Sequence, residues 1–156
     1  MTSSALPPTP EAPEELHADA TARTLLYRIG RTVYGSDIGD IREVVPYRRV
    51  TRLPGAPTHV QGIVNLRGTI VTVIDLGIRL DPTRSPVRQG SILIATVGTR
   101  LVGMAVDDVM DVRQVATEEL TSAGASFDGV VLGLGHSADQ VVILIDIPTL
   151  VQHVLL

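Results

Sequence analysis

The stretches TIVTVIDL, residues 69–76, and QVVILIDI, residues 140–147, decide the fold of this chain. Each is rich in β-branched residues and ends in an Asp followed by a large aliphatic residue. In each case a glycine, Gly62 or Gly133, precedes that Asp at the same spacing. β-Branched side chains lose freedom in a helix and pack well on a pleated sheet. The two stretches therefore predict equivalent strands of a duplicated β-structure.

A second match supports the duplication. Six small or aliphatic positions recur later in the chain at one constant offset, and each keeps its character. The aligned pairs are Gly30 with Gly98, Val33 with Leu101, Gly35 with Gly103, Ile38 with Val106, Ile41 with Val109 and Val44 with Val112. We expect two similar β-units, approximately 22–84 and 87–156. A unit of about 65 residues buries too little surface alone, so the two should pack together through an apolar seam.

Short apolar runs, separated by Gly, Pro, Asp or Thr, predict ten strands. The runs are Leu25–Ile29, Val33–Ile38, Ile41–Pro46, Ile63–Leu66, Ile70–Leu76, Ile92–Val97, Leu101–Val106, Asp111–Val115, Val130–Leu134 and Val141–Ile147. This spacing is typical of barrels or sandwiches. Ala56–Val60 could form one helical turn, and Ile147–Leu155, with Pro148 in its first turn, predicts a terminal helix. The predicted class is all-β with a short C-terminal helix.

The charge distribution excludes several classes of function. The chain has 13 Arg, no Lys and 17 acidic residues, which give a net charge of −4, and residues 1–20 contain four of the acids but no Arg. The remaining body is electrically balanced and lacks the basic surface that nucleic acid requires. Residues 1–21, rich in Pro and acids, are predicted to be a disordered leader. Neither a signal sequence nor a long apolar segment is present, so we expect a cytoplasmic protein without direct membrane insertion.

Patterns that could carry chemistry have simpler interpretations. The sequence has no Cys and therefore no thiolate nucleophile or Cys-bound zinc. Residues 133–138 fit a G-x-G-x-x-A fingerprint, but the following residues read as a strand rather than the helix that a pyrophosphate needs, so a hairpin is expected. The four His residues lack metal-site spacing. Asp75 and Asp146 occupy equivalent strand ends, which favours capping. We expect no enzyme, no cofactor and no metal.

The stretch GIVNLRG at residues 62–68 is the most informative candidate site. Gly68 permits a tight turn after Arg67. An Arg in so apolar a neighbourhood must be paired or must reach a partner. An ordinary hairpin with a solvated Arg is the alternative, and the residues alone leave both interpretations open.

The motifs resemble the CheW chemotaxis coupling proteins over nearly all of residues 24–155. The matching residues include Tyr34-Gly35, Asp37-Ile38, Val50-Thr51-Arg52, Asn65-Leu66-Arg67-Gly68, Ile74-Asp75-Leu76, Val102-Gly103 and Val106-Asp107. Thr72 departs from the family, where relatives often carry Pro. The resemblance implies two five-stranded SH3-like barrels. It also implies a non-enzymatic adaptor, recruited to membrane-associated receptor arrays, that joins chemoreceptor tips to the regulatory domain of the histidine kinase CheA. A scaffold of a non-flagellar pathway, serving twitching motility or developmental signalling, is the alternative.

The resemblance also implies two binding surfaces. The receptor-binding groove corresponds to Ile38, Ile41, Glu43, Gly62 and Arg67. The kinase-binding surface corresponds to Val44, Pro46, Tyr47 and Val50, with a second contact around Thr121–Phe127 that includes Phe127. Tyr47 and Phe127 are two of only four aromatic residues, and each could instead be a core residue. We expect Arg67 to lie partly buried beside Glu43 at the rim of the groove.

Overall fold

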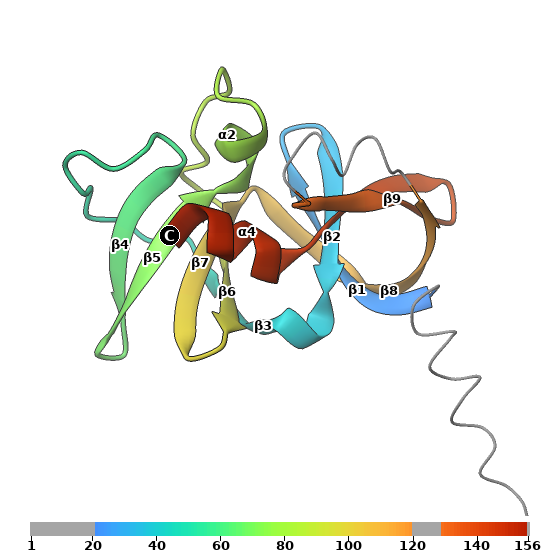
Figure 1. Ribbon diagram of the computed structural model, residues 1–156, viewed down its shortest axis with the longest axis horizontal. Helices are drawn as coiled ribbons and strands as arrows, with labels where there is room; N and C mark the ends of the chain where they lie inside the picture. Colours follow the sequence, from blue (N-terminus) through green and yellow to red (C-terminus); the bar gives the residue numbers. More distant parts are fainter. Residues whose placement is uncertain (1–20, 120–128, 156) are drawn as a thin grey trace, which may run out of the picture.

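The computed structural model describes residues 21–119 and 129–155, which form two adjoining β-units (Figure 1). The strands are β1 (Thr21–Ile29), β2 (Thr32–Asp37), β3 (Ile41–Pro46), β4 (Val60–Leu66), β5 (Thr69–Asp75), β6 (Ser91–Val97), β7 (Arg100–Val106), β8 (Asp108–Glu119), β9 (Val131–Ser137) and β10 (Gln140–Ile145). The helical elements are the 3-10 helix η2 (Ile38–Asp40) and the α-helices α2 (Leu76–Leu80) and α4 (Ile147–Leu155). The structure confirms the predicted all-β class, the ten strands and the terminal helix.

The strands form two five-stranded sheets. The first is a closed barrel with the order β1-β2-β10-β9-β8, and the second sheet has the order β3-β6-β7-β5-β4. Neighbouring strands are antiparallel except for β10 with β2 and β5 with β7, which are parallel. Two like units of five strands agree with the SH3-like architecture that the family resemblance implies.

The sheets do not follow the two halves of the chain. The barrel combines β1 and β2, from residues 21–37, with β8, β9 and β10, from residues 108–145. The approximate subdomains predicted at 22–84 and 87–156 are therefore wrong as spatial units. The physical reason is an exchange of hairpins, in which the first two strands of each repeat pair with the last three strands of the other repeat. Thr21 already lies in β1, so the predicted leader boundary at residue 21 is one residue too late.

The repeat itself is visible in the register of the strands. Gly30 and Gly98 lie in the β1–β2 and β6–β7 turns with φ angles of 62° and 63°. Gly35 pairs in parallel with β10, and Gly103 pairs in parallel with β5. The residues aligned by sequence thus occupy equivalent places in the two sheets.

The two strand-end aspartates have structural roles at the helices that follow them, whereas the sequence predicted capping at the strand ends. The backbone N–H of Ile78 donates to Asp75 Oδ1 at 3.1 Å at the start of α2. The Thr149 hydroxyl donates to Asp146 Oδ2 at the start of α4. Helix α2 was not predicted, because five residues contain too few turns to produce a helical pattern in the sequence.

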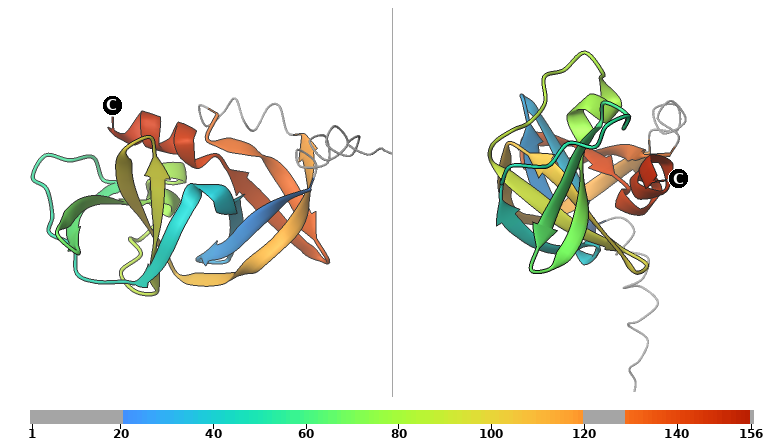
Figure 2. Two further views of the ribbon diagram at one scale, coloured as in Figure 1. Left: turned by 90° about the horizontal axis from the view of Figure 1, so that it is seen from below. Right: turned by 90° about the vertical axis from the view of Figure 1, so that its left-hand side faces the viewer.

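A single apolar cluster joins the two sheets. It contains Tyr27 and Tyr34 of the barrel together with Ile74 and Leu93 of the second sheet. Helix α4 lies across the junction of the two units (Figure 2) and contributes Leu150, which is fully buried. The shared cluster is the seam expected for two units that are each too small to fold alone. Five further residues form a smaller cluster: Leu26, Val33, Val115, Val142 and Leu144.

Candidate protein interaction surfaces

The β4–β5 hairpin displays an arginine at a tight turn. Strand β4 ends at Leu66 and β5 begins at Thr69, so Arg67 and Gly68 are the two central residues. Their φ angles are 52° and 87°, and two positive φ angles define a type I′ hairpin turn, in which Gly is preferred at the second position. The backbone N–H of Gly68 also donates to Asn65 Oδ1 at 2.8 Å. The sequence NLRG therefore fixes the direction in which Arg67 leaves the sheet.

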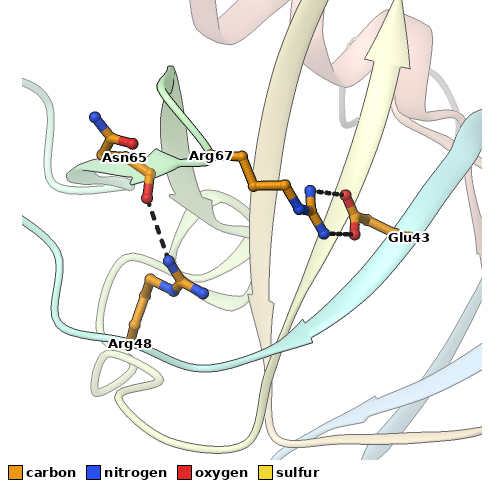
Figure 3. A network of polar contacts seen from close by, with 4 residues as sticks. All are labelled: Glu43, Arg48, Asn65 and Arg67. Atoms are coloured by element: carbon orange, nitrogen blue, oxygen red, sulfur yellow. Dashed lines mark hydrogen bonds and ion pairs between the residues drawn. The ribbon is translucent and has the colours of Figure 1, made fainter.

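The Arg67 guanidinium donates two parallel hydrogen bonds to the Glu43 carboxylate of β3 (Figure 3). The distances are 2.8 Å from Nη1 to Oε2 and 2.7 Å from Nη2 to Oε1. This fork geometry is specific to a guanidinium, and its hydrogen bonds lower the pKa of the Glu43 carboxyl. The predicted pairing is confirmed. The predicted burial of Arg67 is wrong, because its side chain lies at the tip of a turn and is 68% exposed, against 27% for Glu43.

The Arg67–Glu43 pair helps to close the second sheet across its two edge strands. Arg48, just beyond β3, donates to the Asn65 carbonyl oxygen at 3.2 Å. Farther along, Thr51 and Ile63 exchange backbone hydrogen bonds of 2.8 and 2.9 Å. These contacts tie the β3 side of the sheet to β4, where no continuous ladder joins the two strands.

Gly62 permits the close approach of the chain at this closure. Its φ angle is 149°, and a β-carbon at this position would lie 2.1 Å from the Thr51 carbonyl oxygen. Since Thr51 makes backbone hydrogen bonds with Ile63, a side chain at Gly62 would push the two segments apart. Gly62 thus has a structural role beside the Arg67 turn.

The five residues of the predicted receptor groove fall into three groups. Glu43 and Arg67 are in direct contact, and Gly62 lies on the strand that leads to Arg67. Ile38 and Ile41 are half-buried and pack against the common apolar cluster. The roles of these residues in receptor binding stay a prediction.

Most of the predicted kinase-facing residues lie on β3 and the segment that follows it. Val44 is 42% exposed and Pro46 is also exposed. Tyr47 and Val50 are half-buried against the common cluster, and the Tyr47 hydroxyl donates to Gln61 Oε1 at 2.9 Å. Phe127 and the segment Thr121–Phe127 lie outside the described residues.

A network of hydrogen bonds fixes the position of Gln61, the partner of the Tyr47 hydroxyl. Gln61 Nε2 donates to Asp75 Oδ2 at 3.1 Å and to the Val87 carbonyl oxygen at 2.6 Å. The Val87 backbone N–H donates to the same Asp75 oxygen at 2.8 Å. Asp75 is fully buried, so its charge is compensated by hydrogen bonds from three segments. The sequence analysis missed Gln61. A polar side chain near the start of the aliphatic strand β4 could have indicated a specific hydrogen-bonding role.

A cationic pocket opens next to Tyr47. It has a volume of about 830 Å³ and lies between residues 47–61 and 78–88. Five arginines line it, and its lining contains no Asp or Glu: Arg48, Arg49, Arg52, Arg84 and Arg88. The sequence analysis missed this pocket, because the arginines come from two segments that only the fold brings together.

The other sequence patterns behave as structural elements. Ser137 and Gln140 flank the β9–β10 turn, so the glycine pattern at residues 133–138 belongs to a hairpin, as predicted. Within residues 21–119 and 129–155, no group of three His, Asp or Glu side chains is arranged to hold a metal ion. In the same part of the chain, no helix is long and apolar enough to cross a membrane.

The two packed five-stranded units place this chain in the class of proteins built from paired SH3-like β-units. A family model for the CheW-like domain matches residues 23–155. The chain therefore belongs to the CheW-like family of chemotaxis scaffold proteins.

Individual relatives agree with this assignment. The chemotaxis protein CheW of Klebsiella aerogenes is 32% identical over 133 residues, which cover 82% of this chain and 80% of that protein. Protein PilI of Pseudomonas aeruginosa is 29% identical over 115 residues, or 70% of this chain and 65% of that protein. The crystal structure of the scaffolding protein TtCheW from Thermoanaerobacter tengcongensis matches with a TM-score of 0.71 and 29% identity, covering 80% of this chain and 88% of that one.

Proposed function

We propose that this chain is an adaptor that couples the tips of chemoreceptors to the regulatory domain of the CheA kinase. It acts in the cytoplasm, at membrane-associated receptor arrays, by binding two partners at once and without a catalytic step. Membership of the CheW-like family supports the proposal. The observation that carries it is the Arg67–Glu43 pair, which displays a rigid, charged feature on an exposed turn.

The receptor side of the proposal rests on the geometry of that pair. Both carboxylate oxygens of Glu43 accept hydrogen bonds from Arg67, and this contact fixes the orientation of the guanidinium. Its remaining donors face outward, since the side chain is 68% exposed. A guanidinium has five N–H donors, so Arg67 can hold Glu43 and a polar group of a receptor helix together.

The kinase side rests on the neighbouring surface of β3 and the following segment. Val44 supplies exposed apolar area, and Tyr47 supplies a ring whose position is fixed by Gln61. Rigid aromatic anchors surrounded by apolar contacts are typical of the residues that dominate binding energy at interfaces. We assign this surface, with Pro46 and Val50, to the kinase regulatory domain.

A second pathway fits the same contacts. The similarity to Protein PilI favours, as the alternative, a scaffold that serves a non-flagellar system such as twitching motility. The binding surfaces would be the same in both pathways, and the response regulator of the kinase would determine the output.

Binding of the full-length chain to each partner separately tests the proposal. We would measure its affinity for a purified kinase regulatory domain and for a receptor cytoplasmic fragment by isothermal titration calorimetry. Arg67→Lys keeps the charge but loses the planar fork, and it should weaken receptor binding nearly as much as Arg67→Ala. Binding to the kinase domain should persist in both variants.

Arg23→Ala is the matched control, because Arg23 is exposed on β1 and pairs with Gln114 in the barrel, whereas the β4–β5 turn belongs to the second sheet. It should bind both partners like the wild type. Wild-type protein that binds neither partner would refute the adaptor function. Receptor binding by Arg67→Lys equal to that of the wild type would show that only charge matters at this position.

A further inference from the structure

We infer that the cationic pocket beside Tyr47 receives a carboxylate-rich segment of the kinase regulatory domain. The inference rests on the proposed function and adds the chemistry of the contact. The pocket has a volume of about 830 Å³, within the range of roughly 300–1,000 Å³ that is typical of binding pockets.

The charge of the pocket is compensated only in part by its surroundings. Within the described residues, the five lining arginines form no ion pair. Arg48 and Arg84 donate to neutral carbonyl oxygens, those of Asn65 and Ile29. Two acids lie near the pocket without lining it. Asp81 interacts electrostatically with Arg84, and the oxygens of the buried Asp75 already accept hydrogen bonds from Gln61, Val87 and Ile78. Five arginines against these two acids leave the pocket with a surplus of positive charge that an anionic group could neutralise.

This concentration of charge stands out against the rest of the chain. Four of the 17 acidic residues lie in residues 1–20, so residues 21–156 contain 13 acids against 13 Arg. Five of these arginines line one concavity. Such a local surplus on a neutral body steers an acidic partner toward this face and fixes its orientation on binding.

The apolar lining favours a protein segment over a small anion. Tyr47 and Val50 form part of the lining, together with Leu53, which is 40% exposed. A free phosphate would leave these side chains uncovered, whereas an acidic peptide segment can place apolar side chains against them. Tyr47 and Val50 also belong to the proposed kinase surface, so the pocket continues that surface into a charged recess.

The chain's own acidic leader is a competing occupant, since 20 extended residues can span roughly 66 Å. The first described residue, Thr21, pairs with Ala116 in the barrel, whereas the pocket is built on the second sheet and its loops. We assign the pocket to the partner protein because Tyr47 and Val50 belong both to its lining and to the proposed kinase surface, and the leader is one outcome of the test.

Two double variants test the inference, and each replaces two arginines by glutamates, so that both change the net charge equally. Arg49→Glu/Arg88→Glu reverses two exposed residues of the pocket, and Arg23→Glu/Arg100→Glu reverses two exposed residues elsewhere. The affinity of each full-length variant for the kinase regulatory domain would be measured from about 0.05 M to about 0.5 M NaCl. The pocket variant should lose about tenfold or more in affinity and most of its salt dependence. The control should stay within about twofold of the wild type.

A labelled hexaglutamate peptide measures the affinity of the pocket for an acidic ligand in the absence of the kinase. It should bind the wild type and the control, lose affinity for the pocket variant and compete with the kinase domain. Equal kinase binding by both double variants would overturn the inference. So would a tripolyphosphate ion that binds the pocket without competing with the kinase domain, or a leader deletion of residues 1–20 that raises peptide affinity about tenfold. Wild-type protein that fails to bind the kinase domain would instead refute the proposed function, and with it the partner assigned to the pocket.

Discussion

Replacing Gly62 by Ala should break the closure of the second sheet. The new β-carbon would lie 2.1 Å from the Thr51 carbonyl oxygen, a backbone atom that no side-chain rotation can move away. Loss of the two Thr51–Ile63 hydrogen bonds costs about 1 kcal/mol each. The positive φ angle of 149° adds about 1–3 kcal/mol of backbone strain. The free energy of unfolding should therefore fall by about 3–5 kcal/mol.

Gly55→Ala provides the matched control for this change. Gly55 has a φ angle of 80°, and a β-carbon there would meet no heavy atom within 4 Å. This variant therefore carries only the backbone penalty of about 1–2 kcal/mol. Equilibrium unfolding in urea measures the loss of stability in both variants, as a lowered midpoint concentration at constant slope. If Gly62→Ala were no less stable than Gly55→Ala, the Thr51–Ile63 closure would contribute nothing, and the reasoning from the close approach would be wrong.

Four further predictions concern the exposed surfaces. Arg67→Asn creates the preferred Asn-Gly turn, so thermal melting should show equal or higher stability while calorimetry shows lost receptor binding; a lowered melting temperature would contradict this. Tyr47→Ala should weaken kinase binding by about 2 kcal/mol or more, and Tyr47→Phe should lower the unfolding free energy by about 1 kcal/mol. Unchanged kinase affinity together with lost stability in Tyr47→Ala would make Tyr47 a core residue. Because pairing lowers the pKa of Glu43, its stabilising contribution is present at neutral pH and is lost as the pH falls through that lowered value. Urea unfolding at several pH values should show this loss in the wild type and not in Glu43→Gln. Deleting residues 1–20 should leave the melting temperature within about a degree or two, and a large drop would show that the leader docks.

The fold could be predicted to the extent that it depends on local patterns. The alternation of apolar runs and turn residues predicted each strand, and Pro148 marked the start of α4. Which hairpin joins which sheet could not be predicted in this way. The two repeats have similar strands, so pairing within a repeat and pairing between repeats satisfy the same apolar pattern. The connection through η2, which leads from the barrel to β3 in the second sheet, becomes visible only in the structure.

The site was predicted where the resemblance supplied geometry and was missed where it did not. The Arg67–Glu43 pairing followed from the family resemblance, but the exposure of Arg67 depends on how far the turn extends beyond the sheet. Gln61 gave little signal, since a single Gln beside a strand has many possible roles. The cationic pocket depends on two arginine-bearing segments, residues 48–52 and 84–88, whose proximity no local pattern indicates.

The exchange of hairpins makes this protein a natural candidate for fragment complementation. A cut between Asp81 and Pro86 would leave two pieces, each of which is one repeat. The first two strands of each repeat lie in one sheet, and its last three strands lie in the other. Neither piece could complete a sheet alone, but together they would restore both. Two copies of a single half could likewise complete each other's sheets. The same arrangement would thus arise from a half-length homodimer whose genes later fused, with the linker at residues 81–86 as the joint.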